Sequence, residues 1–244
     1  MSSLRRVKAV IAYDGAYFRG FQKQKETKNT VTTAIEDALI SIGIESSING
    51  SGRTDAGVHA SGQVIDFVLP PFWRDLNRLK EILNRKLEYI SFKHISFVSN
   101  SFHARFSAKK RVYRYIFKTT PLSVFEKRYI SYYPKFNKEL LQESLKLFEG
   151  QYDFSLFLKT GTLTHTNIRT IYRAYYREIG NYHIIYFEAN GFLRSQVRIM
   201  VEFAMMVALN RLTIKEQLAQ LKLKKRYSTK LAPPNGLYLA RIIY

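Results

Sequence analysis

The sequence predicts an α+β fold built from two halves that carry strands and helices in the same order. Short runs rich in β-branched and aromatic residues indicate strands. Longer stretches with apolar residues at helical spacing indicate helices. The third observation is that both kinds of segment recur in one order in each half of the 244 residues.

In the first half, the pattern predicts two helices among four strands. Thr30 is a suitable N-cap for the first helix, and Gly43 is placed to end it. Pro70-Pro71 stops the strand that precedes the second helix. The expected elements are a strand at 7–13, a helix at 30–42, strands at 44–48 and 63–69, a helix at 76–87 and a strand at 89–98.

The second half repeats this order and adds one short helix. Gly180-Asn181 separates two β-rich runs, and such a pair is a strong hairpin signal. Gly150 is placed to end the helix before it. The expected elements are a strand at 111–118, a helix at 138–148, hairpin strands at 168–179 and 183–189, helices at 192–209 and 213–223, and a closing strand at 237–243.

Each half therefore has the order β-α-β-β-α-β. This order predicts a mostly antiparallel sheet with helices on one face, the ferredoxin-like arrangement. We expect one half at residues 1–105 and the other at 106–244, with a cleft between them. The boundary carries no Gly/Ser-rich linker, so we expect the halves to pack firmly.

The composition points to a polyanionic partner. The formal net charge is +20, and a chain with this much like charge is usually matched by an anion such as nucleic acid. There is no cysteine, which excludes disulfides, thiolate zinc sites and cysteine nucleophiles. No segment has the length and hydropathy of a signal peptide or membrane span, so we expect a cytoplasmic protein without membrane contact.

The stretch Gly50-Ser51-Gly52-Arg53-Thr54-Asp55-Ala56-Gly57-Val58-His59-Ala60 is the strongest candidate for chemistry. Its glycine spacing does not fit a dinucleotide-binding fingerprint, and Val58-His59 stands where a phosphate-binding loop needs Lys and Ser/Thr. The chain lacks the nucleophile elbow of hydrolases and paired histidines at zinc-helix spacing. The loop therefore presents one carboxylate without a metal or a triad.

Two interpretations of Asp55 stay open from the residues alone. An aspartate in a glycine-rich loop commonly caps backbone N–H groups in a turn. The alternative is a catalytic carboxylate, because Arg53 is two residues away and small residues on both sides leave room for a substrate.

The loop also resembles the signature of the TruA-type tRNA pseudouridine synthases. Four other segments agree with that family, in the same order and over essentially the full length of the chain. These segments are Tyr13-Asp14-Gly15 with Gly20-Phe21-Gln22-Lys23-Gln24; Phe102-His103-Ala104-Arg105-Phe106 with Arg111-Val112-Tyr113-Arg114-Tyr115; Asn190-Gly191-Phe192-Leu193-Arg194 with Val197-Arg198-Ile199-Met200-Val201; and Ala232-Pro233-Pro234-Asn235-Gly236-Leu237-Tyr238-Leu239.

The resemblance implies a cofactor-free isomerisation on the tRNA anticodon arm, at uridines 38, 39 and 40, by a homodimer that uses no metal. The glycosidic bond of a uridine breaks, the uracil turns, and the ring is rejoined through C5. One ionised carboxylate suffices as nucleophile or base. A nearby arginine lowers the pKa of a carboxylate by roughly 1–3 pH units. The resemblance does not say whether the carboxylate attacks the sugar, attacks the base or removes a proton.

The resemblance also assigns site residues. Asp55 matches the catalytic aspartate, and Arg198 matches the arginine that pairs with it. Tyr113 matches a tyrosine that stacks on the uracil, and Leu237 a residue that supports the uracil from the other side; for both, a plain core position is the alternative. Candidates for holding the RNA are Arg19, Gln22, Arg53, His59, His103, Arg105, Lys110 and Arg194.

Two positions depart from the family pattern. Phe21 stands where many members have tryptophan, and Glu202 stands where a glycine is usual. Neither change removes a reacting group. Two other functions stay open on the sequence: an RNA-binding protein without catalysis, and a synthase that acts on a different RNA.

Overall fold

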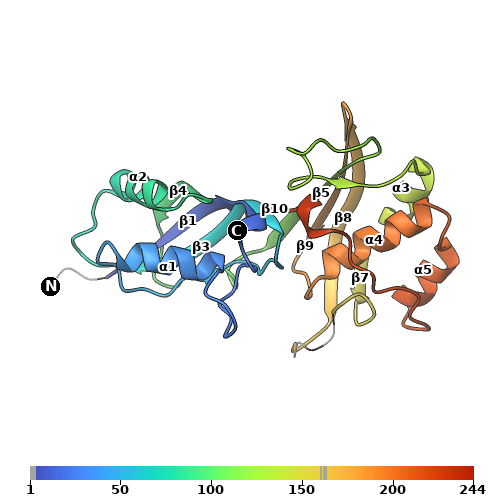
Figure 1. The fold of residues 1–244 in the computed structure, drawn as a ribbon. Helices are drawn as coiled ribbons and strands as arrows, with labels where there is room; N and C mark the ends of the chain where they lie inside the picture. Colours follow the sequence, from blue (N-terminus) through green and yellow to red (C-terminus); the bar gives the residue numbers. More distant parts are fainter. Residues whose placement is uncertain (1–3, 160, 162–163) are drawn as a thin grey trace. The chain divides into compact units, whose positions relative to one another are not determined.

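The computed structural model describes residues 4–159, 161 and 164–244, which form two compact units. One unit comprises the chain up to Lys109 together with Tyr238–Tyr244, and the other comprises Lys110–Leu237. In chain order (Figure 1) the strands and α-helices are β1 (Arg5–Tyr13), α1 (Val31–Ile40), β2 (Asn49–Gly50), β3 (His59–Leu69), α2 (Leu76–Lys86), β4 (Ile90–Phe97), β5 (Lys110–Lys118), β6 (Ser131–Tyr132), α3 (Lys138–Leu147), β7 (Gly150–Asp153), β8 (Ile168–Ile179), β9 (Tyr182–Ala189), α4 (Gln196–Ala208), α5 (Ile214–Leu221) and β10 (Leu237–Ile243).

The first unit is built on a sheet with the strand order β4-β1-β3-β10. β2 pairs with β3 at Ile65 and Asp66. β1 runs antiparallel to both β3 and β4, whereas β10 runs parallel to β3. Val7, Ala9 and Ile11 of β1 are fully buried and alternate with partly exposed neighbours, so one face of this strand forms core. The side chain of Thr30 accepts a hydrogen bond from the N–H of Thr33, which confirms the predicted cap of α1.

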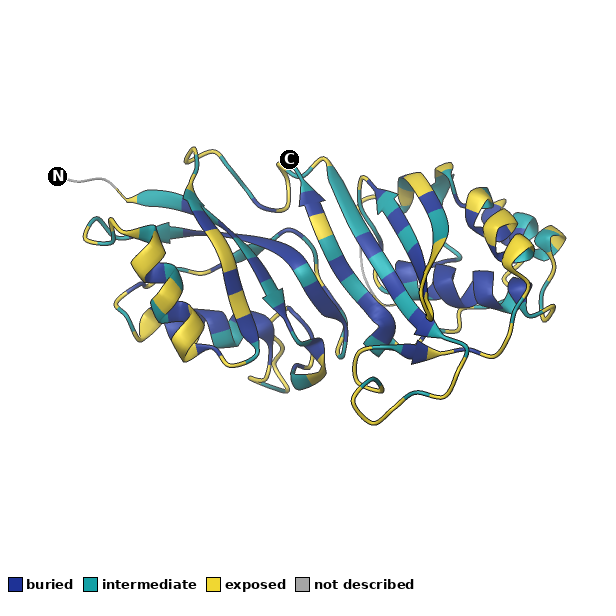
Figure 2. Cartoon of the chain, turned by 90° about the horizontal axis from the view of Figure 1, so that it is seen from above, coloured by how far each residue is buried: buried dark blue, intermediate teal, exposed yellow. Residues whose placement is uncertain are grey.

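The second unit has the strand order β5-β9-β8-β7, all antiparallel, and β6 pairs in parallel with the end of β5. α3 packs against α4 and against β8. Tyr115, Phe117 and Phe187 are fully buried, so aromatic rings dominate this core. α4 is buried along nearly its whole length, as its dark colour in Figure 2 shows.

The prediction of an α+β fold with mostly antiparallel strand pairing is confirmed, and most elements lie within a few residues of their predicted bounds. The strand predicted at 44–48 is wrong. Side chains rather than a strand ladder bind the backbone there: Glu36 Oε1 accepts from the N–H of Ile48 at 2.9 Å, and Ser46 Oγ accepts from the N–H of Val68 at 3.0 Å. The strand starts only at Asn49.

The long helix also starts later than predicted, at Gln196 instead of residue 192. Ser195 adopts a left-handed backbone conformation with φ +58°, which a helix cannot include. The side chain of Gln196 accepts from the N–H of Leu193 at 2.7 Å and so closes the preceding turn. The segment that carries Arg194 is therefore a loop.

The closing strand lies where the sequence predicts it. Sequence order placed residues 237–243 in the second half, whereas β10 pairs in parallel with β3 through Tyr238–His59 and Leu239–Ala60. The close fit is visible at Gly62, where a Cβ would lie 2.3 Å from the carbonyl oxygen of Ala240. The division predicted at residue 105 thus differs from the structure in where Tyr238–Tyr244 belongs.

Candidate active-site loop and its surroundings

The loop between β2 and β3 is fixed by hydrogen bonds on both sides of Asp55. Gln63, fully buried, donates from Nε2 to the carbonyl oxygen of Gly52 at 2.6 Å. The hydroxyl groups of Tyr13 and Thr54 hydrogen-bond at 2.7 Å in a buried position. The N–H of Phe21 donates to the carbonyl oxygen of Thr54 at 3.1 Å. The residue just before Asp55 is therefore held by both its side chain and its backbone.

Asp55 itself opens a tight turn. Its carbonyl oxygen accepts from the N–H of Val58 at 3.1 Å, and Gly57 takes the positive φ of +77° that this turn needs. Val58 is 2% exposed, whereas Asp55 is half-buried. Hydrogen bonds thus hold the backbone around the half-buried Asp55, and Arg53, two residues before it, is exposed.

Two other segments of the first unit meet this loop. Gly20 lies with its Cα so close to the loop that a Cβ would be 3.1 Å from the carbonyl oxygen of Thr54. At Gly15 a Cβ would be 2.0 Å from the carbonyl oxygen of Val58. Segments that are far apart in the sequence therefore form one cluster. The segment 19–24 also brings Arg19 and Gln22, both exposed, to the neighbourhood of the loop.

His59 lies beneath the loop and is 2% exposed. Its Nδ1 accepts from the N–H of Gly15 at 3.0 Å and lies 3.2 Å from the carboxylate of Asp14, and its ring stacks on Tyr238 at 4.7 Å. A nitrogen that accepts a hydrogen bond carries no proton, so the contact with Asp14 is not an ion pair in that state. The structure therefore shows His59 as a buried ring that binds the N–H of Gly15.

The predicted site residues of the second unit also cluster. Tyr113 on β5 is 7% exposed and packs edge-on against Phe192, with ring centroids 5.2 Å apart. Arg111 on the same strand donates to the carbonyl oxygen of Asn190 at 2.6 Å. Both contacts join the motif at 111–115 to the motif at 190–194, at whose end Arg194 is exposed.

Arg198 lies in the first turn of α4 and is half-buried. Its Nε donates to the carbonyl oxygen of Ala232 at 2.7 Å, and the N–H of Ala232 donates back to the carbonyl oxygen of Arg198 at 3.1 Å. Leu237, five residues further along, is 4% exposed at the start of β10. The motif at 232–239 is therefore bound to the helix that carries Arg198.

Two of the remaining RNA-contact candidates are partly occupied by other contacts. Lys110 is half-buried, with its Nζ 3.2 Å from the carboxylate of Glu188 and 5.3 Å from the ring centroid of Tyr172. His103 is half-buried and accepts at Nδ1 from the N–H of Arg105 at 3.1 Å. Arg105 is exposed, and its guanidinium carbon lies 5.5 Å from the ring centroid of Phe106.

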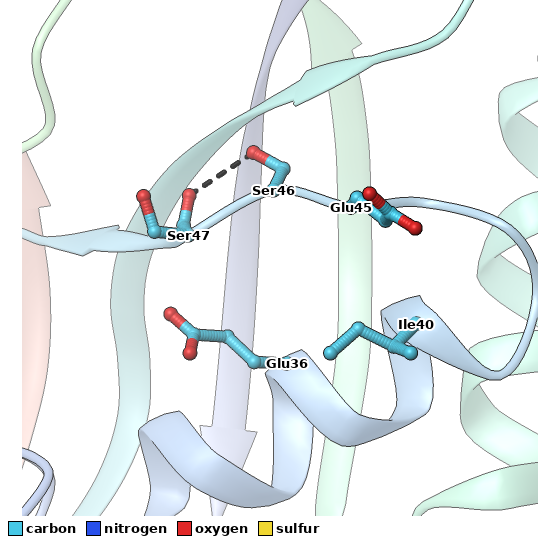
Figure 3. Close-up of a pocket in the computed structure, with 5 residues that line it drawn as sticks. All are labelled: Glu36, Ile40, Glu45, Ser46 and Ser47. Atoms are coloured by element: carbon cyan, nitrogen blue, oxygen red, sulfur yellow. Dashed lines mark hydrogen bonds between the residues drawn. The ribbon is translucent and has the colours of Figure 1, made fainter.

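An open pocket of the first unit lies away from this loop. It measures about 340 Å³ and is lined by Glu36, Ile40, Glu45, Ser46 and Ser47 (Figure 3). The Oγ of Ser46 donates to the carbonyl oxygen of Ser47 at 3.1 Å, and Glu36 forms an ion pair with Lys23. Two carboxylates in its lining disfavour a phosphate-bearing ligand, so this pocket does not compete with the loop as the site for RNA.

The comparison with protein families shows which family the chain belongs to. The model of the tRNA pseudouridine synthases matches residues 9–107 and 145–244, which together hold all the site residues named above except Lys110 and Tyr113. The chain belongs to the tRNA pseudouridine synthase family. It is 38% identical over 237 residues to the tRNA pseudouridine synthase A of Wolinella succinogenes, covering 97% of this chain and 93% of the relative.

Other relatives of this synthase family agree over a similar span. The tRNA pseudouridine synthase A of Campylobacter jejuni strain RM1221 is 38% identical over 240 residues, covering 98% of this chain and all of the relative. That of Helicobacter hepaticus is 38% identical over 243 residues, covering 97% of this chain and 98% of the relative. None of the described helices is long and apolar enough to cross a membrane.

The synthase fold also contains a buried polar centre that sequence reasoning missed. Asp66 on β3 is fully buried; its Oδ1 accepts from the N–H of Ala104 at 2.7 Å, and its Oδ2 from Asn49 Nδ2 at 3.1 Å. Arg6 forms an ion pair with the same carboxylate. This centre fixes the segment that presents Arg105. The available signal was a charged residue at an apolar position of a strand, which needs partners when buried.

Proposed function

We propose that this chain converts uridine to pseudouridine in the anticodon stem-loop of tRNA, at positions 38, 39 and 40. The observation that carries the proposal is the loop around Asp55, in which a reachable carboxylate sits on a backbone bound from both sides. Its relatives carry the name tRNA pseudouridine synthase A. The choice of these three uridines rests on the resemblance to the TruA type.

The reaction is an isomerisation, so all atoms of the uridine stay in the product. The bond from C1′ to N1 breaks, a bond from C1′ to C5 forms, C5 loses a hydrogen and N1 gains one. The reaction needs a group that detaches the base from the sugar or removes the proton from C5. It needs neither an oxidant nor an added water. Asp55 supplies this group as nucleophile or base. A fixed carboxylate also removes the entropy cost of orienting the group in each turnover.

We assign four residues to the chemistry. Asp55 reacts, Arg198 pairs with its carboxylate and keeps it ionised, and Tyr113 and Leu237 hold the uracil ring. Support for Arg198 is its backbone-anchored guanidinium, whose Nε is bound by Ala232. A flipped base loses its own stacking, and an aromatic face returns about 1–3 kcal/mol per base. That is the role proposed for Tyr113.

We propose that the exposed cations bind the RNA backbone. Arg19, Arg53, Arg105 and Arg194 are exposed together with Gln22, and the formal net charge of +20 favours a polyanion. Lys110 and His103 are secondary candidates, because Glu188 and the backbone of Arg105 engage them. Homodimer formation and a cytoplasmic location complete the proposal.

We further propose that each half is ferredoxin-like. In the first unit, β1, α1, β2, β3, α2 and β4 follow one another in that order. The strands are arranged β4-β1-β3-β2 with antiparallel neighbours, which is the arrangement expected for a β-α-β-β-α-β unit. We assign the reacting carboxylate to this half and the pairing arginine to the other.

The test is Asp55→Asn, measured by tritium release from tRNA labelled at C5 of uridine. We expect release to be abolished while tRNA binding stays within about twofold, because the amide keeps the shape of the side chain and loses its basicity. The matched control is Asp37→Asn, the same change at an exposed position of α1. Release near the wild-type rate in Asp55→Asn would contradict the proposal.

A second measurement separates catalysis from RNA binding alone. Pseudouridine mapping of tRNA from cells with the gene and without it should show three anticodon-arm positions that depend on the gene. Binding should weaken with salt, along a linear plot of log K against log salt. Binding without any gene-dependent pseudouridine would favour an RNA-binding protein without catalysis.

A further inference from the structure

The helix that carries Arg198 also carries a buried carboxylate that the proposed reaction does not use. Glu202 is 4% exposed and lies on α4 among apolar residues. A carboxylate in such surroundings is costly unless it is paired and hydrogen-bonded. Its Oε2 accepts from the hydroxyl of Tyr133 at 2.7 Å, and its Oε1 lies 2.9 Å from Nζ of Lys230. Burial raises the pKa of Tyr133, so this phenol stays a donor to Glu202 at neutral pH.

Glu202 and Arg198 are four residues apart, so they lie on the same face of α4 in successive turns. Both bind one short segment. Arg198 exchanges two hydrogen bonds with Ala232, and Glu202 pairs with Lys230, two residues earlier. The segment 230–232 is therefore attached to α4 at two points, and removal of either leaves it held by one.

The next residues of this segment are bound from the opposite side. The hydroxyl of Tyr115 shares its one proton between the carbonyl oxygen of Pro233 at 3.1 Å and Ser131 Oγ at 2.8 Å. Ser131 in turn donates to Oδ1 of Asn235 at 3.0 Å. The segment thus lies between α4 on one side and the strands β5 and β6 on the other.

This arrangement leads directly to Leu237. At Gly236 a Cβ would lie 2.6 Å from Ser131 Oγ and 2.7 Å from the carbonyl oxygen of Ile116, so the backbone packs closely against β5 and β6 there. Leu237 follows as the first residue of β10. The contacts that hold the segment 230–236 therefore set the positions of both Arg198 and Leu237.

We propose that Glu202 is a positioning residue, whose pairing with Lys230 and Tyr133 clamps the segment 230–236 against α4 and so aims Arg198 and Leu237 at the uridine. This inference rests on the proposed function. The exposures of the pair suit the role: the side chain of Glu202 is 6% exposed and that of Lys230 is 63% exposed. Glu202 is thus the fixed partner of the pair, because it is buried on the helix. It holds the segment 230–236 through the side chain of Lys230.

An alternative use of Lys230 is direct contact with an RNA phosphate. The two roles predict different kinetics. A phosphate contact contributes to binding, and its loss raises KM and reduces the salt dependence. A clamp contributes to the geometry of the reacting groups, and its loss lowers kcat. In the clamp, Glu202 and Lys230 also act as one unit, so their effects do not add.

The experiment compares Lys230→Gln, Glu202→Gln and the double variant with the wild type, on anticodon-arm tRNA labelled at C5. We expect each single variant to lower kcat by about ten- to a hundredfold while KM changes less than about twofold. The double variant should be no slower than the slower single variant. Lys230→Arg keeps the cation and should restore most of kcat. The matched control is Lys224→Gln, the same change at another exposed lysine between α5 and β10. This variant should retain wild-type kcat.

Wild-type kcat in both single variants would overturn the inference, and so would a rise in KM with kcat unchanged or additive losses in the double variant. Lys230 is exposed, so Lys230→Gln gives the result even if Glu202→Gln folds poorly, and thermal melting of each variant identifies that case. If the wild type releases tritium and Asp55→Asn does not, the proposed function stands whatever these variants do. A wild type without activity would overturn both.

Discussion

The hydroxyl groups of Tyr13 and Thr54 hydrogen-bond at 2.7 Å beneath the loop that carries Asp55. Tyr13 is the last residue of β1 and is 5% exposed, and Thr54 is 8% exposed. The rigid sheet thus reaches the residue directly before the proposed catalytic carboxylate. Because the neighbouring backbone of Asp55 is tied to this contact, the strength of the contact should appear in turnover more than in RNA affinity.

Tyr13→Phe removes one partner of this hydrogen bond and little volume. We expect the free energy of unfolding to fall by about 1 kcal/mol. Single-turnover pseudouridine formation should slow by more than tRNA binding weakens, because the loop is then less tightly placed. Urea unfolding and rapid-quench kinetics measure the two effects. Tyr132→Phe, at an exposed tyrosine, is the control, and unchanged turnover in Tyr13→Phe would show that the sheet does not position the loop through this contact.

Gly15→Ala tests how closely the motif at 13–15 packs under the same loop. The added Cβ would lie 2.0 Å from the carbonyl oxygen of Val58, so the backbone of one segment must move. We expect a loss of about 1–3 kcal/mol or more in the free energy of unfolding. The control is Gly191→Ala, where the nearest heavy atom is the Arg169 side chain at an ordinary 3.6 Å. Equal melting temperatures of the two variants would contradict the packing described here.

Asp66→Asn tests the buried centre that holds the segment 99–107. The carboxylate accepts from Ala104 and Asn49 and pairs with Arg6, and the amide leaves Arg6 without its counter-charge. Breaking one side of a buried pair costs about 3–5 kcal/mol. We expect the free energy of unfolding, measured in urea, to fall by about 3 kcal/mol, because the side chain of Arg6 is 23% exposed and water partly screens its charge.

The same variant should loosen the segment that presents Arg105. Limited trypsin digestion should cut after Arg105 faster in Asp66→Asn than in the wild type, since the backbone anchor at Ala104 is weakened. Asp37→Asn is the control for loss of a carboxylate at an exposed site. A digestion rate equal to that of the wild type would mean that the contacts of Tyr244 with Ala104 are sufficient to hold the segment.

Local patterns predicted the elements of this fold well because helices and strands depend on nearby residues. The cap at Thr30 and the hairpin turn at Gly180 are of this kind. The differences arose where another part of the chain decided the outcome. The side chain of Glu36 accepts the hydrogen bond of the Ile48 N–H, which a strand partner would otherwise accept. β10 pairs with β3, which lies far away in the sequence. Neither partner is encoded in the local pattern.

The candidate site divides in the same way. The motif at 50–60 indicated Asp55 as a candidate, and the resemblance to a synthase family gave it a catalytic role as a prediction. Its supports could not be selected, because Tyr13 and Gln63 have the ordinary appearance of strand residues. His59 was expected at the RNA, and only three-dimensional packing shows that its ring is buried against Gly15 and Tyr238.

His183 should make stability depend on pH. It is 6% exposed, stacks on Phe117 at 5.1 Å, and its Nδ1 lies 2.6 Å from the hydroxyl of Tyr176. Burial lowers the pKa of His183, opposed by the charge of Glu178 and supported by that of Lys138. The unfolded chain then binds a proton at a pH where the folded chain does not. The contribution of neutral His183 to the free energy of unfolding is therefore present above about pH 6.5. It is lost as the pH falls from there through the pKa of His183 in the folded chain.

We expect His183→Phe to remove this part of the pH dependence. In urea unfolding between pH 7.5 and pH 5, the wild type should lose more free energy of unfolding than the variant, because the phenylalanine has no proton to bind. The difference between the two proteins cancels the titration of carboxylates that they share. His94→Gln, at an exposed histidine, should follow the wild type. A wild type that is stabilised relative to His183→Phe on acidification would mean that the folded state favours the charged ring, through Glu178, over the neutral one.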